Sequence, residues 1–191
     1  MIEGVASKIG QALRNVRPGI GALASSRLRS VPRTLRVTSP AFTDGGQIPA
    51  RYTQDGEGLF PPLGWESVPA TAKSLALLVE DADAPFPRPL VHAVLHGIPP
   101  HLGGLPEGAL PKRLTGPAPL GFSAGRNSLT RPGWMAPSPM PGHGPHRYAF
   151  QLFALDFVPR FAHTPGRTLL MRTIRSHILA YGRLTGVYRR D

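Results

Sequence analysis

The chain has 191 residues, with 23 prolines, 22 glycines, no cysteine and a formal net charge of +11. The absence of cysteine excludes disulfides, thiolate metal sites and a cysteine nucleophile, and no stretch approaches the roughly 18–20 apolar residues that span a bilayer. No apolar run at the N-terminus precedes a small-residue cleavage site, so no secretory signal is expected and the expected location is cytoplasmic.

The positive charge is concentrated at the N-terminus, because residues 1–36 carry a net charge of +6 and the remaining 155 residues only +5. Glu3 is the one acidic residue of this segment, and its basic residues are Lys8, Arg14, Arg17, Arg27, Arg29, Arg33 and Arg36. The other arginines are scattered, without the interleaving of aromatic and basic residues typical of RNA-binding sequences. Specific nucleic-acid binding is therefore not expected.

The first 34 residues are predicted to form a basic helical extension and linker, followed by a domain over residues 35–191. Apolar residues recur here at helical spacing: Val5, Ile9, Ala12, Leu13 and Val16. Pro18 and Gly19 end this helix, and residues 19–33, rich in Ser, Gly and Arg, are interpreted as a linker. The helix is expected to dock on the domain or on a second copy in a homodimer. Its basic flank leaves peripheral membrane contact as an alternative.

Apolar runs of strand length dominate the rest of the chain and are separated by loops rich in Pro and Gly. They cover residues 35–38, 74–80, 90–98, 148–155 and 184–188. Before the last of them, Leu170, Ile174, Ile178 and Tyr181 fall on one helical face that Gly182 would close. The sequence therefore predicts an all-β fold, a two-sheet antiparallel β-sandwich with a C-terminal helix.

Two loops beside these strands concentrate polar groups. Residues 81–85 contain Asp81 and directly follow one strand, and His92 lies on the next. Residues 142–148 contain His146 and Tyr148, with glycines that let backbone N–H groups approach a ligand. Histidines, a tyrosine hydroxyl and exposed amides can accept an oxyanion, and a nearby carboxylate keeps a histidine oriented and charged.

From about residue 35 to residue 189 the chain resembles the bacterial and archaeal branch of the phosphatidylethanolamine-binding protein family, which includes the Raf-kinase-inhibitor-like proteins. The shared motifs are SPAF at 39–42, DGE at 55–57, PPLGW at 61–65, SLALLVEDADAP at 74–85, VH at 91–92, GIP at 97–99, GLPEG at 104–108, GHGPHRY at 142–148 and LTGVY at 184–188. Their order and spacing extend over about four-fifths of the chain.

The resemblance implies a β-sandwich with a small anion pocket for phosphate-like or carboxylate groups. Matched by motif, its ligand-binding residues are Asp81, Pro85, His92, Pro139, Gly144, His146 and Tyr148. Asp83 and Arg147 are expected to form an internal ion pair between the two loops. The walls depart from the family pattern, since Leu90 and Ala93 replace aromatic residues and Met140 replaces a proline. A wider, less selective mouth is therefore expected.

Metal binding and catalysis are the competing interpretations of these residues. His92, His96, His143 and His146 form a histidine set, but His96 lies about 13 Å along the strand from His92 at 3.3 Å per residue. No metal or cofactor is therefore expected. Ser123 and Ser138 lie outside a nucleophile elbow, so no catalytic residue is assigned and an enzyme is not expected.

Three functions follow in order of preference. The first is a ligand-binding or regulatory protein for phosphorylated small molecules or lipid headgroups. The second is an inhibitor that binds a protein partner, a protease or a kinase, with the same pocket rim. The third is a minor hydrolase.

Overall fold

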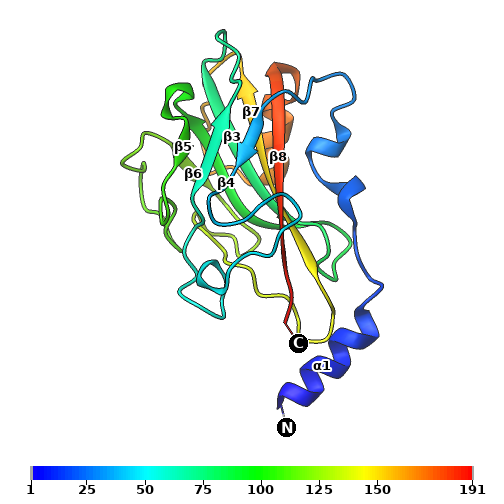
Figure 1. Ribbon diagram of the computed structural model, residues 1–191. Coiled ribbons are helices and arrows are strands. Elements are labelled where there is room, and N and C mark those ends of the chain that lie inside the picture. The colour runs from blue at the N-terminus through cyan, green and yellow to red at the C-terminus, as the bar shows by residue number, and fades with distance from the viewer. Residues whose placement is uncertain (1, 191) are drawn as a thin grey trace.

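The computed structural model describes residues 2–190 and the side chains of residues 4–190, and it is mostly β, with two antiparallel sheets and few helices (Figure 1). The smaller sheet has the order β1 (Arg36–Thr38), β2 (Leu63–Glu66), β5 (Gly104–Leu105). The larger has the order β6 (Ser123–Gly125), β4 (Leu90–Ile98), β3 (Ser74–Asp81), β7 (His146–Leu155), β8 (Ile178–Tyr188). The helices are α1 (Ile2–Leu13), α2 (Arg167–Ile174) and short 3₁₀ turns at Ile20–Ala22, Ser25–Arg27, Ala50–Tyr52, Pro100–Leu102 and Arg175–His177.

Strand β3 is the centre of the larger sheet and is buried along its whole length. Leu75, Leu77 and Val79 contribute to the core between the two sheets. Ala76 and Leu78 point to the opposite face and belong to a second cluster. Because both faces are covered, the strand has an uninterrupted apolar sequence instead of an alternating one. Asp81, the polar last residue of β3, is therefore held at the end of a rigid central strand.

The core between the sheets includes aromatic residues from the loops. Phe60 packs edge-on against Trp134, with ring centroids 5.2 Å apart, and Trp134 lies 6.2 Å from Phe150 of β7. The Trp134 indole N–H donates to the Leu59 carbonyl at 3.0 Å. These contacts fix the long loop before β7 on the sheet.

The outer face of the larger sheet is covered by α2 and by residues of the N-terminal segment. Ala24 and Leu28 pack in the same cluster as Leu170 and Ile174 of α2 and Phe153 of β7. The backbone N–H of Ala24 donates to the buried Glu80 carboxylate at 2.9 Å. Residues 19–33 were expected to form a linker, but part of this segment is a packed layer of the fold.

The predicted C-terminal helix is too long. Helix α2 ends at Ile174, and Ile178 begins β8, which pairs with β7 over its whole length. Ile178 and Tyr181 do pack beside Leu170 and Ile174, as expected, but from a strand. Burial in β8 alternates from residue to residue, and a Cβ at Gly182 would lie 2.3 Å from the Leu35 carbonyl oxygen. Gly182 is therefore a close-approach site within a strand and not a helix terminator.

Helix α1 projects from the end of the sheets near the C-terminus (Figure 1). It contacts the rest of the chain through Gly10, where an added Cβ would lie 2.0 Å from the Pro141 carbonyl oxygen. Among the described residues, no helix is both long enough and apolar enough to cross a membrane.

Candidate functional site

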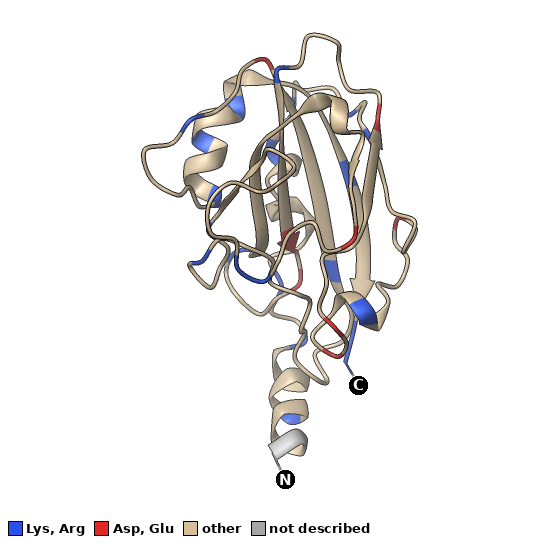
Figure 2. Cartoon of the chain, turned by 90° about the vertical axis from the view of Figure 1, so that its left-hand side faces the viewer, with Lys and Arg blue, Asp and Glu red and all other residues tan. Residues whose placement is uncertain are grey.

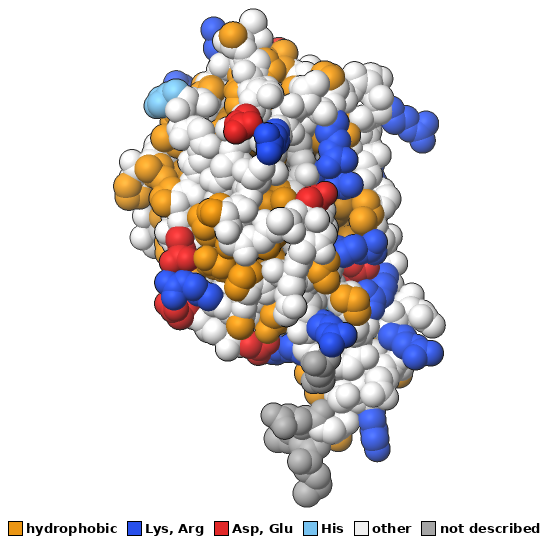
Figure 3. All heavy atoms as spheres, in the orientation of Figure 1, with side chains coloured by type: hydrophobic (Ala, Val, Ile, Leu, Met, Phe, Trp, Pro, Cys, Tyr) orange, Lys and Arg blue, Asp and Glu red, His pale blue; other side chains and the backbone are white. Residues whose placement is uncertain are grey.

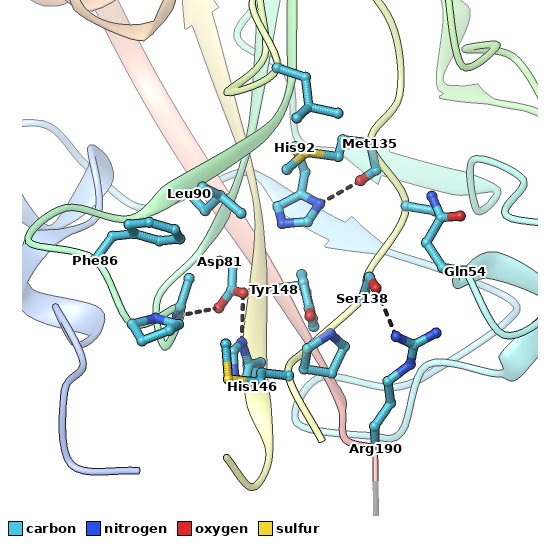
Figure 4. A pocket seen from close by; sticks show the side chains of 16 residues that line it. Gln54, Asp81, Phe86, Leu90, His92, Met135, Ser138, His146, Tyr148 and Arg190 are labelled. Carbon is cyan, nitrogen blue, oxygen red and sulfur yellow. Dashed lines mark hydrogen bonds and ion pairs between the residues drawn. The ribbon is translucent and has the colours of Figure 1, made fainter. Parts of the chain in front are cut away.

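A cavity of about 590 Å³ lies where β3 ends and β7 begins (Figure 4). Of the seven residues expected to bind a ligand, the structure brings six to its wall: Asp81, Pro85, His92, Pro139, His146 and Tyr148. Gly144 does not line the cavity. It lies beside Arg17 instead, and a Cβ added at Gly144 would be 3.3 Å from the Arg17 guanidinium.

Three adjacent strands position the polar residues of the cavity. Asp81, the last residue of β3, pairs with Tyr148 of β7 on one side and with Leu90 of β4 on the other. His146 and Tyr148 are two residues apart on β7 and therefore share a face of the sheet. His92 lies two residues beyond Leu90 on β4. Residues far apart in the sequence thus converge because their strands are neighbours.

The Asp81 carboxylate is fully engaged by the protein. Its Oδ1 accepts hydrogen bonds from the backbone N–H groups of Asp83 at 2.8 Å and Ala84 at 3.1 Å. Its Oδ2 lies 2.7 Å from His146 Nδ1. Asp81 therefore shapes the turn after β3 and orients His146 at the same time.

His146 begins a chain of hydrogen bonds that reaches helix α1. Its Nε2 lies 2.8 Å from His143 Nδ1, and His143 Nε2 lies 2.9 Å from the carbonyl oxygen of Leu13. A carbonyl can only accept, so His143 Nε2 carries a proton. Burial chiefly lowers the pKa of His143, which favours its neutral form. His143 Nδ1 is then an acceptor, and His146 must donate from Nε2. Both ring nitrogens of His146 are therefore occupied.

The predicted ion pair between Asp83 and Arg147 is confirmed. Arg147 Nε and Nη2 donate to the two Asp83 carboxylate oxygens at 2.7 and 2.6 Å, and its backbone N–H donates at 2.9 Å. Arg17 adds a second cation at 3.4 Å. Despite burial, the hydrogen bonds from Arg147 hold the pKa of Asp83 below its usual value. The pair connects the loop after β3 to the start of β7.

His92 and Tyr148 each present a polar atom without a hydrogen-bond partner among the described residues: His92 Nε2 and Tyr148 Oη. His92 Nδ1 is hydrogen-bonded to the Met135 carbonyl, and Met135 N–H donates to the His92 carbonyl at 2.9 Å. Burial, opposed by Asp81, lowers the pKa of His92, and burial raises the pKa of Tyr148 well above its usual value. Both groups are thus neutral.

The walls of the cavity only partly match the sequence expectation. Leu90 and Met140 line it, as does the half-exposed Phe86. Ala93 does not, because it faces the core between the sheets. The predicted widening of the mouth at Ala93 therefore does not arise, because the pairing of β4 with β3 is irregular between Val91 and Ala93 and Ala93 packs into the core instead of lining the cavity.

Sequence reasoning missed Gln54, Arg190 and the role of His143. Gln54 and Arg190 line the cavity although they are far apart in the sequence. Arg190 is paired with Asp55 and donates from Nη1 to Ser138 Oγ at 3.0 Å. No local signal marks these residues, whereas His143 was visible as a histidine three residues before His146. Among the described residues, no group of three or more His, Cys, Asp or Glu side chains is placed to hold a metal ion.

Taken with the fold, this geometry defines a small β protein with a cavity at the ends of adjacent strands, in whose wall two polar atoms have no hydrogen-bond partner among the described residues. The sequence model of the phosphatidylethanolamine-binding protein family matches residues 38–189. The chain therefore belongs to this family.

Individual relatives and solved structures agree with that assignment. The chain is 40% identical over 156 residues to the UPF0098 protein of Methanothermobacter thermautotrophicus, which covers 82% of this chain and 99% of the relative. A phosphatidylethanolamine-binding protein homologue from Chlamydia trachomatis has a TM-score of 0.74 and 32% identity, covering 83% of this chain and 99% of its own. YbcL of E. coli has a TM-score of 0.75 and 27% identity, with coverages of 82% and 99%.

Proposed function

We propose that the protein is a ligand-binding or regulatory protein whose cavity accepts the phosphate-like group of a phosphorylated small molecule or a lipid headgroup. The observation that carries this proposal is the pair of buried, unpartnered atoms in the wall, His92 Nε2 and Tyr148 Oη. Buried polar groups in folded proteins are almost always hydrogen-bonded. Two such atoms in one cavity indicate the position of a missing polar partner.

The remainder of the wall supports the same interpretation. Asp81 and His146 are satisfied internally and hold the wall in place. Pro85, Pro139 and Met140 add apolar surface beside the polar atoms. A mostly apolar cavity with a few fixed polar groups is typical of sites for small organic ligands. A phosphate attached to an organic group would contact both kinds of surface.

Replacing Tyr148 with phenylalanine is expected to abolish phosphate binding without loss of stability. The substitution removes a hydroxyl that has no partner among the described residues, so the apo protein should retain its melting temperature or gain slightly. Wild type should be stabilised by inorganic phosphate in proportion to ln(1 + [L]/Kd). Thermal unfolding with increasing phosphate measures both effects.

The matched control is Tyr52→Phe, since the Tyr52 hydroxyl donates to Glu107 at 2.7 Å outside the cavity. This variant should lose some stability but keep the phosphate response. Equal responses in Tyr148→Phe and wild type would contradict the proposal.

Inhibition of a protein partner is the alternative use of the same rim. Phe86 and Leu129 line the cavity and remain about half exposed, at 52% and 51%. Such side chains are suited to contact a protease or kinase. Free phosphate should then compete with the protein partner for the cavity. Phe86→Ser should weaken the affinity for the partner without changing the affinity for phosphate. The hydrolase alternative has less support, because Ser138 is hydrogen-bonded by Arg190 and not by a histidine.

A second proposed contact is between α1 and an anionic lipid surface. Val5 and Ile9 of α1 are exposed at 57% and 47% and lie one helical turn apart, and Val16, three residues after the end of the helix, is exposed at 45%. Lys8 and Arg14 are exposed beside them. The sequence places Glu3 and Lys8 in α1, and Arg14 and Arg17 directly after it. In the part of α1 whose side chains are described the charged residue is basic (Figure 2), and apolar and basic side chains lie together on this surface (Figure 3). This combination favours shallow binding to an anionic membrane.

Cosedimentation with vesicles tests this contact. Wild type should bind vesicles containing phosphatidylserine better than pure phosphatidylcholine vesicles, and salt should weaken the binding. Ile9→Asp should reduce binding about tenfold or more, because burial of an isoleucine contributes about 1.5–3 kcal/mol. The control Val158→Asp changes an equally exposed apolar residue away from α1, at 53%. Concentration-dependent dimerisation without vesicle binding would instead identify a second copy as the occupant.

A further inference from the structure

We infer that the cavity selects oxyanions that carry a proton, so that it accepts hydrogen phosphate or a phosphomonoester monoanion and rejects sulfate and phosphodiesters. This inference rests on the proposed anion site and specifies its ligand class. It follows from the hydrogen-bonding roles of His92 and Tyr148, the two residues with unpartnered atoms in the cavity.

The tautomer of His92 is fixed by its contact with the Met135 carbonyl. A carbonyl has no proton to donate, so His92 Nδ1 must carry one. A neutral imidazole has a single N–H, and Nε2 is therefore a lone-pair acceptor. The ring is almost fully buried, at 2% exposure, and packs against Tyr148 and Trp134. In Figure 4 its second nitrogen faces the cavity.

Tyr148 supplies the opposite function. Its hydroxyl is buried and has no partner among the described residues, and the phenol retains its proton at neutral pH. It can therefore donate to a ligand oxygen. The floor thus offers one acceptor and one donor, and a matching ligand needs one protonated and one unprotonated oxygen.

The other ionisable groups of the cavity do not change this pattern. The titratable and charged groups that line it are Asp81, His92, His146, Tyr148 and Arg190. Asp81 and His146 are bonded to each other and to other parts of the chain, so His146 has no free N–H for an anion. Arg190 pairs with Asp55 and stays charged. His92 Nε2 is therefore the acceptor that requires the ligand to carry a proton.

Common anions differ in whether they carry a proton at neutral pH. Sulfate and hydrogen phosphate are both dianions of similar shape at neutral pH, but only hydrogen phosphate carries a proton. A phosphomonoester keeps its proton below a second pKa of about 6, whereas a phosphodiester has lost its only proton. The inference therefore favours a terminal phosphate, on a small molecule or on a lipid such as phosphatidic acid, over the diester of most lipid headgroups.

Calorimetric titration of the full chain tests this class. At pH 7 inorganic phosphate should bind at least about tenfold more tightly than sulfate, because sulfate would leave the buried acceptor unpaired. The affinity for glycerol phosphate, a soluble monoester, should fall about tenfold per pH unit above about pH 6, because the protonated monoanion becomes rarer. The affinity for inorganic phosphate should vary little between pH 6 and 8. Dimethyl phosphate should bind as weakly as sulfate, and short-chain phosphatidic acid should behave as the monoester does.

A substitution at His92 gives an independent readout. In His92→Gln the side-chain amide can either donate or accept, so sulfate and phosphate should bind within about twofold of each other. His96→Gln changes a histidine on the same strand outside the cavity and should keep the wild-type preference. If the His92 variant does not fold, the ligand series on the wild type alone decides.

The possible failures can be told apart. Equal affinities for sulfate and phosphate would show that the ligand need not carry a proton. A loss of affinity at the same pH for every ligand would show that the titrating proton belongs to the protein. Either result would overturn the proposed selectivity but leave an anion site. No binding of inorganic phosphate would overturn the proposed function as well. Tighter binding of the diester than of the monoester would also overturn the inference.

Discussion

A chain that begins at Pro32 is expected to be severely destabilised, by about 3–6 kcal/mol from the loss of two buried leucines alone. Leu23 and Leu28 are 1% and 8% exposed and belong to clusters on the outer face of the larger sheet. Their removal would expose Ala76, Leu78 and Ala149 to water. Since domains have only about 5–15 kcal/mol of total stability, little folded protein should remain. Urea unfolding followed by tryptophan fluorescence measures the loss.

The matched control is a chain that begins at Gly19, which lacks α1 and Arg17 but keeps the packed segment. Asp83 retains its bidentate partner Arg147, so the cost should be about 1 kcal/mol. Equal losses for the two truncations would place the stabilising contacts in α1. No loss of stability for either truncation would support the sequence-based prediction that residues 19–33 are a linker.

Replacing Glu80 with alanine is expected to cost about 3–5 kcal/mol, because it leaves a partly buried guanidinium without its partner. The Glu80 carboxylate is completely buried and accepts from Ala24 N–H, from Gln151 Nε2 at 2.7 Å and from Arg167 Nε. It therefore connects β3 to the N-terminal segment, to β7 and to α2. The free energy of unfolding of the variant is the measurement.

The control for Glu80 is Glu66→Ala, which breaks the exposed pair of Glu66 with Arg36 at 3.5 Å. Exposed pairs contribute about 0–1 kcal/mol. Hydrogen exchange should also accelerate at Ala24 and Ser25 in the Glu80 variant only. A Glu80 variant as stable as the Glu66 variant would show that the N-terminal segment is held by apolar contacts alone.

The sequence predicted three of the four long strands well, because each of the three has a strong apolar pattern. The runs at 74–80, 90–98 and 148–155 correspond to β3, β4 and β7 within one or two residues. Strands β2, β5 and β6 have only two to four residues, too few for a period to be visible. The residues of β8 that continue the helical spacing of α2 misled the helix prediction, because side-chain spacing alone does not identify the backbone that carries it.

The polar residues beside the predicted strands indicated an oxyanion site, and the resemblance supplied the matching of individual residues to it. Asp81, His92, His146 and Tyr148 follow family motifs, and the structure places all four around one cavity. The tautomer of His92 was not predictable, because it depends on a contact with the carbonyl of Met135, 43 residues away in the sequence. Gln54 and Arg190 required the tertiary fold.

The hydrogen bond from His143 to Leu13 has a thermodynamic consequence for the N-terminal helix. Docking of α1 supplies the last acceptor of a chain that ends on Asp81. Because linkage is reciprocal, docking of the helix and binding of a ligand that strengthens or weakens these contacts must affect each other by the same factor. A ligand in the cavity that acts on His146 would therefore change the population of docked helix. The cavity and helix α1 are thus coupled through this chain of hydrogen bonds.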